Sequence, residues 1–166
     1  NPFNMLDADF RKEVDKRLAA VGRYQTRYND FIAVQQIMKD NKLKPADIEL
    51  VHLHCSTMAQ RHCAWPYEPQ GVTSAQMSLY YTLAVMAHDG EVLTGQFDPA
   101  RLRDPALLDF IKRIRIEVDP AFDVGGDATR HESRMAVTTR DGRRFERHEQ
   151  FRKGSPKNPM TREERH

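Results

Sequence analysis

Histidine and cysteine side chains cluster near the middle of the chain, and their types are those that bind metal ions. His52, His54 and Cys55 come first, and His62 and Cys63 follow a few residues later. On a β-strand His52 and His54 point to the same face, which suits chelation, whereas Cys55 points to the opposite face. The set is therefore split, and its spacing matches no standard zinc pattern. We expect no metal site here, but a solvated strand face and a buried Cys55.

An almost wholly apolar run, Ser74 to Gly90, carries two further reactive side chains, Tyr80 and Tyr81. Its pattern is helical, and it stops at a glycine, the residue that commonly follows a helix end. A helix that is apolar all round is expected to be buried on all sides, and a chain of 166 residues is small for that task. We therefore expect a piece of a larger protein, with this helix at a domain interface.

The elements that must position these residues follow from hydrophobic periodicity and turn residues. The periodicity predicts amphipathic helices over residues 6–18 and 30–39, a strand or loop over 23–28, and a short helix over 104–112. It predicts strands over residues 48–55, 114–118, 135–139 and 143–151, the last two joined by an Asp141-Gly142 hairpin turn. Residues 56–73 contain two prolines and a glycine and are predicted to be an irregular connection.

These elements predict an α+β fold in which about four mostly antiparallel strands are covered on one face by helices. At the C-terminal end, Thr161 and Glu164 form a capping box, so a helix is expected to begin where the chain stops. Together with the absence of an initiator methionine at Asn1, this leads us to expect an excised fragment, or a processed or trimmed protein.

Composition and charge exclude several classes of protein. The 26 basic and 24 acidic residues nearly cancel, so we expect no nucleic-acid partner, and the basic residues of the last quarter are diluted by glutamates. No run of 18 apolar residues occurs and the N-terminus does not resemble a signal peptide, so we expect a soluble protein without a membrane partner. Two cysteines cannot form a disulfide framework at this size, which favours the cytoplasm.

Several short motifs occur in a distinctive order along the chain. They are Lys44-Pro45-Ala46-Asp47-Ile48, Ala75-Gln76-Met77-Ser78-Leu79-Tyr80-Tyr81, Asp89-Gly90, Phe97, Leu102-Arg103-Asp104-Pro105, Asp141-Gly142, Gly154-Ser155-Pro156-Lys157-Asn158-Pro159 and Glu164. This ordered set covers about residues 30–164 and resembles the C-terminal part of the MmgE/PrpD family. That family includes 2-methylcitrate dehydratase, cis-aconitate decarboxylase and iminodisuccinate epimerase.

The resemblance implies an organisation and a chemistry. Residues 23–153 would form the α+β lid domain, preceded by a helix and linker over 1–22 and followed over 154–166 by the crossover to a helical domain. Family members act on di- or tricarboxylates by elimination, decarboxylation or epimerisation, without a cofactor, in a cleft between the two domains. The resemblance further implies a homodimer for the full-length protein, and inactivity for the lid domain alone.

The resemblance also assigns site residues. The tyrosine that closes the family's Ser-Leu-x-Tyr motif falls on Tyr81, whose phenol would donate to a substrate carboxylate or to the carbon being protonated. The alternative is that Tyr81 only packs in a buried helix with its hydroxyl hydrogen-bonded. The family's lysine, proline and histidine before the first lid helix have no counterpart here, although Arg23 and Arg27 are suited to hold a carboxylate. A guanidinium stays protonated, so neither arginine can replace the lysine or the histidine in transferring a proton.

A second hypothesis assigns the chain a non-enzymatic function and remains open beside the lid-domain hypothesis. The chain would then be a free-standing, non-catalytic α+β binding or assembly module, whose exposed apolar helix face pairs with a partner.

Overall fold

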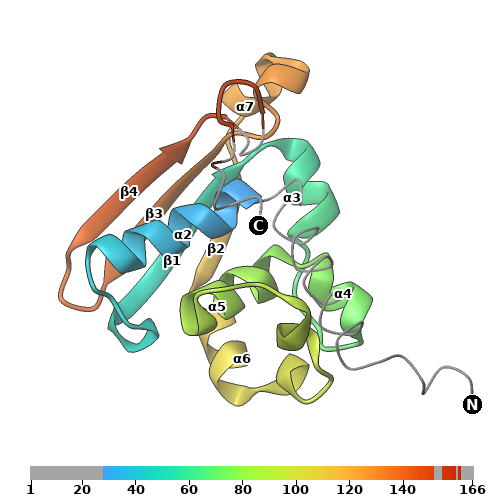
Figure 1. Ribbon diagram of the computed structural model, residues 1–166, viewed down its shortest axis with the longest axis vertical. Coiled ribbons are helices and arrows are strands. Elements are labelled where there is room, and N and C mark those ends of the chain that lie inside the picture. Colours follow the sequence, from blue (N-terminus) through green and yellow to red (C-terminus); the bar gives the residue numbers. More distant parts are fainter. Residues whose placement is uncertain (1–27, 152–154, 160, 162–166) are drawn as a thin grey trace, which may run out of the picture.

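The computed structural model describes residues 28–151, 155–159 and 161, and within them an α+β fold (Figure 1). The four strands are β1 (Ile48–Cys55), β2 (Ile114–Val118), β3 (Ser133–Thr139) and β4 (Arg144–Glu149). The α-helices are α2 (Tyr28–Asp40), α3 (Thr57–Cys63), α4 (Val72–Gln76), α5 (Leu79–Asp89), α6 (Pro105–Ile111) and α7 (Ala121–Val124). Short 3-10 helices are η2 (Pro45–Asp47), η3 (Thr94–Phe97), η4 (Arg101–Arg103) and η5 (Gly126–Ala128).

The strands form one mixed sheet in the order β2-β1-β3-β4. β1 pairs in parallel with β2, whereas β1 with β3 and β3 with β4 are antiparallel, so the predicted mostly antiparallel sheet is confirmed. The predicted Asp141-Gly142 turn joins β3 to β4, with Gly142 at a φ of 86° that favours glycine. Parallel pairing requires a long crossover, and here it contains α3 to α6.

The helices form a layer on one face of the sheet. α2 packs against β3, β4 and α5, and α6 packs against α5 (Figure 1). Alternate residues of β1, namely Val51, Leu53 and Cys55, point into this layer and are fully buried. The other face carries polar side chains, and there α7 covers only one end of the sheet, where Phe122 stacks on His148.

The run from Ser74 to Gly90 is not one helix, and this prediction was wrong. It contains α4 and α5, separated at Met77 and Ser78. Ser78 has extended backbone angles, and its side chain accepts a hydrogen bond from the Tyr81 N–H at 3.2 Å, so it caps a new helix. The predicted end is confirmed, because Gly90 closes α5 in the left-handed conformation at φ 73°.

The chain buries α5 by itself, contrary to the expectation from its size. Eight of its eleven residues are buried, Tyr80 and His88 are partly buried and Asp89 is exposed, so α5 has no fully exposed apolar side chain in the described part of the chain. Layered packing explains this result: α5 lies between α2 and α6 and meets α4 at its start. The exposed apolar face required by the assembly-module hypothesis is therefore not present on this helix.

The connection over residues 56–73 is also more ordered than predicted. It begins with α3, which Ser56 caps by accepting a hydrogen bond from the Ala59 N–H. The prolines and the glycine that dominate its composition fall after this helix. The remaining helix and strand predictions from residue 30 to residue 151 are confirmed within a few residues.

Several predictions lie outside the described residues. These are the helix over 6–18, the segment over 23–28 apart from its last residue, and Glu164 of the capping box. The division into segments 1–22, 23–153 and 154–166 stays a prediction. No helix among the described residues is long and apolar enough to cross a membrane.

Asp104 caps α6, and its removal tests the electrostatics of this helix start. Its Oδ1 accepts a hydrogen bond from the Ala106 N–H at 2.8 Å, and its Oδ2 pairs with Arg101. The Ala106 N–H and, to a smaller extent, Arg101 hold the pKa of Asp104 below its usual value. We expect Asp104→Ala to lower the free energy of unfolding at pH 7 by about 1 kcal/mol, measured by urea denaturation.

The sign of the pH dependence follows from the lowered pKa. The folded-state pKa lies below the unfolded-state value of about 3.9, so the stabilisation is fully present above that pH and is lost as pH falls through the folded-state value. The difference between wild type and Asp104→Ala should shrink over that acidic range. Asp104→Asn is the matched control, because it keeps the acceptor oxygen without a titrating carboxyl; an equal loss in both variants would contradict the capping role.

Candidate functional site

Tyr81 lies in the first turn of α5, where local hydrogen bonds fix its backbone. The Ser78 hydroxyl oxygen accepts from the Tyr81 N–H, and the Thr82 hydroxyl donates to the Ser78 carbonyl at 2.8 Å. The sequence folds this way because serine is a strong N-cap residue and the following residues are apolar. The tyrosine is thus placed on a rigid element rather than on a loop.

The side chain of Tyr81 is enclosed by its own domain. Its exposed fraction is 0%, and its ring packs against Tyr67 and Phe97, with ring centroids 5.0 and 5.7 Å away. The hydroxyl donates to the backbone carbonyl of Gln96 in η3 at 2.5 Å. In this arrangement the phenol satisfies its hydrogen bond within the domain.

Burial raises the pKa of Tyr81 to about 12, and the neighbouring Tyr67 adds to the increase. The phenol is therefore protonated at every physiological pH, so it is available as a hydrogen-bond donor or acid but not as a base. Nearby charges act in opposite directions on this pKa, with Arg101 lowering it and Asp89 and Asp104 raising it.

The same charged groups form an ion-pair bridge close to Tyr81. Arg101 contacts Asp89 at the end of α5, at 2.5 Å, and Asp104 at the start of α6. The bridge ties η4 to both helices around the tyrosine. Because the guanidinium of Arg101 already pairs with two carboxylates, it is less able to bind a carboxylate of a substrate. We therefore assign Arg101 a structural role.

The other site residues assigned from the sequence are two arginines. Arg23 and Arg27 lie outside the described residues. Tyr80, the neighbour of Tyr81, is partly buried, and burial raises its pKa too. The roles of Tyr81, Arg23 and Arg27 in binding or catalysis stay predictions.

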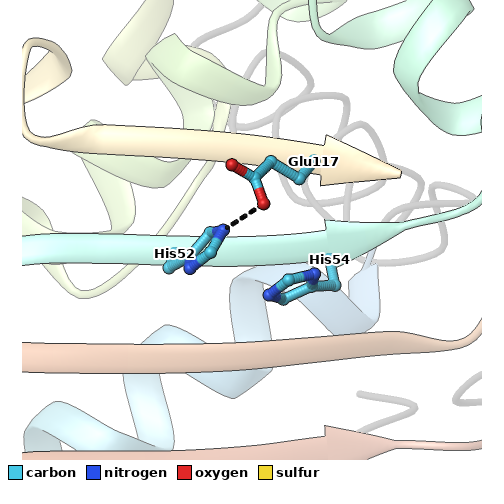
Figure 2. A group of neighbouring side chains, drawn as sticks. All are labelled: His52, His54 and Glu117. Carbon is cyan, nitrogen blue, oxygen red and sulfur yellow. Dashed lines mark ion pairs between the residues drawn. The ribbon is translucent and has the colours of Figure 1, made fainter. Parts of the chain in front are cut away.

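A second group of reactive side chains lies on the polar face of the sheet. His52 and His54 of β1 point to the same side, as expected from the alternation, and the carboxylate of Glu117 on β2 extends toward His52 (Figure 2). His52 Nε2 lies 3.1 Å from Glu117 Oε2, and the two histidine ring centroids are 4.2 Å apart. Burial, with His52 and Arg134 nearby, lowers the pKa of His54, so its imidazole is neutral at pH 7.

Sequence reasoning missed Glu117 and Gln96 as members of these sites. The β1–β2 register places Glu117 beside His54, but the two residues are far apart in the chain, and no local pattern pairs them. Gln96 acts through its backbone carbonyl, which carries no signal in the residue type.

Comparison with known proteins gives three findings. A sequence model of the MmgE/PrpD C-terminal domain matches residues 32–166. The cis-aconitate decarboxylase of Aspergillus terreus is 28% identical over 127 residues, which are 74% of this chain and 24% of that protein. A cis-aconitate decarboxylase of Aspergillus terreus strain NIH 2624 / FGSC A1156 is 27% identical over the same length and the same shares. The chain spans about a quarter of the length of these relatives.

Proposed function

Because the chain belongs to the MmgE/PrpD family through its C-terminal domain, we propose that it forms the lid of a cofactor-independent lyase or isomerase that acts on di- or tricarboxylates. The observation that carries this proposal is the family match over residues 32–166, together with two similar proteins named as cis-aconitate decarboxylases. Cis-aconitate and 2-methylcitrate are the first substrates to consider.

The activity belongs, in this proposal, to the full-length protein rather than to the lid alone. The lid closes over the substrate against a helical domain of the same protein, and two such chains form a homodimer. Two cysteines cannot form a disulfide framework in a chain of this size, so we place the enzyme in the cytoplasm.

Tyr81 is the proton donor of the lid in this proposal. Its hydroxyl exchanges the Gln96 carbonyl for a substrate carboxylate, or for the carbon being protonated, when the cleft is occupied. The raised pKa supports the role of donor and argues against that of base. Arg23 and Arg27 would bind the other carboxylates of the substrate through paired N–H groups.

An assay of the full-length protein tests the proposal. We expect one of cis-aconitate, 2-methylcitrate and related polycarboxylates to be consumed without added cofactor, with proton NMR identifying the product. Decarboxylation, dehydration and epimerisation give different products, so the same spectra define the reaction. A folded full-length protein that consumes none of these acids would contradict the substrate class. Full activity of the 166-residue chain alone would contradict the lid assignment.

A further inference from the structure

We propose that His52, His54 and Glu117 bind a divalent transition-metal ion of the Zn²⁺ class on the polar face of the sheet. Among the described residues, they form a group whose ligand atoms all lie within 4.8 Å of one another. This site is distinct from the Tyr81 region, because Tyr81 belongs to the helix layer on the opposite face. The inference therefore does not depend on the proposed enzymatic function.

The spacing of the three side chains is close to that of a coordination shell. Zinc ligands at about 2.0–2.2 Å in tetrahedral geometry lie about 3.4 Å from each other. His52 Nε2 and Glu117 Oε2 are already 3.1 Å apart, and the remaining separations reach at most 4.8 Å. We expect side-chain rotation to close that difference without movement of the backbone.

The Nε2 atom of His52 is available to bind a cation. Nε2 is enclosed and makes no hydrogen bond, although Glu117 Oε2 is near, because the two groups are not aligned for one. A buried polar atom without a hydrogen bond is costly. A metal ion that accepts the nitrogen lone pair and pairs with the carboxylate would remove this cost.

The scaffold holds the three residues in place before any ion binds. His52 and His54 lie two residues apart on β1, an interior strand that is paired on both sides, and Glu117 is the register partner of His54 on β2 (Figure 2). Strands fix side-chain positions better than loops do, which favours a preformed site.

The donor set selects the class of ion. Imidazole nitrogens suit Zn²⁺, Cu²⁺ and Ni²⁺, whereas Mg²⁺ and Ca²⁺ prefer shells made of oxygen. Three protein ligands leave at least one coordination position for water or a further ligand, and Glu117 is half exposed on that side. Arg134, the register partner of His54 on β3, would repel a bound cation, but the carboxylate of Asp119 pairs with Arg134 and offsets its charge.

Calorimetric titration of the untagged 166-residue chain with ZnCl₂ tests the proposal, and Co²⁺ absorption provides a second readout. We expect one ion per chain and a Co²⁺ spectrum typical of nitrogen and oxygen ligands. His52→Ala and His54→Ala should each weaken Zn²⁺ binding at least about tenfold, and Glu117→Gln should also weaken it. Far-UV circular dichroism checks that each variant is folded.

The matched control is His148, which lies on the same face and contacts Glu132 at 3.0 Å, as a histidine–carboxylate pair outside this group. His148→Ala should leave Zn²⁺ affinity unchanged. The proposal is overturned if the wild-type chain shows no saturable binding. It is also overturned if folded His52→Ala and His54→Ala variants bind as tightly as the wild type, or if His148→Ala weakens binding as much as they do.

Discussion

The full-length protein carrying Tyr81→Phe is expected to turn over its polycarboxylate substrate about 100- to 10,000-fold more slowly than the wild type, which is the usual contribution of a general acid. The substitution removes one hydroxyl and keeps the ring that packs against Tyr67 and Phe97. If the phenol acts on the reacting carbon, kcat falls while KM changes little, and steady-state kinetics separates the two.

The raised pKa adds a further expectation for this residue. With its pKa near 12, the phenol stays protonated across the range in which the enzyme can be assayed. Ionisation of Tyr81 in the free enzyme should therefore not limit kcat/KM on the alkaline side below about pH 11. An alkaline limb at lower pH would have to come from another group.

Tyr80→Phe is the matched control, because the two tyrosines are neighbours on α5 and both phenols have raised pKa values. It should keep nearly full activity. A Tyr81→Phe enzyme with unchanged turnover would show that the hydroxyl only satisfies the Gln96 carbonyl. In that case the loss of one hydrogen bond would lower the free energy of unfolding by about 1 kcal/mol and nothing more.

The 166-residue chain carrying Leu83→Ala is expected to lose about 2–5 kcal/mol of unfolding free energy, the range for a truncated core leucine. Leu83 is fully buried in the middle of α5 and belongs to the main hydrophobic core. A loss of this size is a large part of the total stability of a domain, which is about 5–15 kcal/mol. Urea denaturation followed by far-UV circular dichroism measures it.

Met77→Ala provides the comparison for this prediction. Met77 lies between α4 and α5 and is 45% exposed, so its truncation should change the free energy of unfolding by less than about 0.5 kcal/mol. A small loss for Leu83→Ala in this chain, with a large loss only in the full-length protein, would mean that another domain buries α5.

Local patterns in the sequence predicted most of the fold. Alternating apolar residues identified the strands, and Asp104-Pro105 and Gly90 marked helix ends that the structure confirms. The break at Ser78 was missed because the surrounding residues continue a helical pattern, although serine is itself a cap signal. α3 was missed because the prolines that follow it dominated the composition of the whole segment.

The candidate sites were less predictable, for a physical reason. The sequence indicated that His52 and His54 share a face, because that property depends on spacing alone. It could not place Glu117 beside them, since that contact depends on which strands pair. Likewise, the family motif identifies Tyr81, but the hydrogen bond from its hydroxyl to the Gln96 carbonyl depends on tertiary packing and could not be predicted.

The position of β1 in the sheet has a consequence for the order of folding. β1 comes first among the strands in the chain and lies between β2 and β3, both of which come much later. Such pairings raise the contact order, whereas β3 and β4 can form a hairpin from local sequence alone. We therefore expect the β3–β4 hairpin to form early and the β1–β2 pair late, so slow refolding should coincide with the formation of the His52–Glu117 contact.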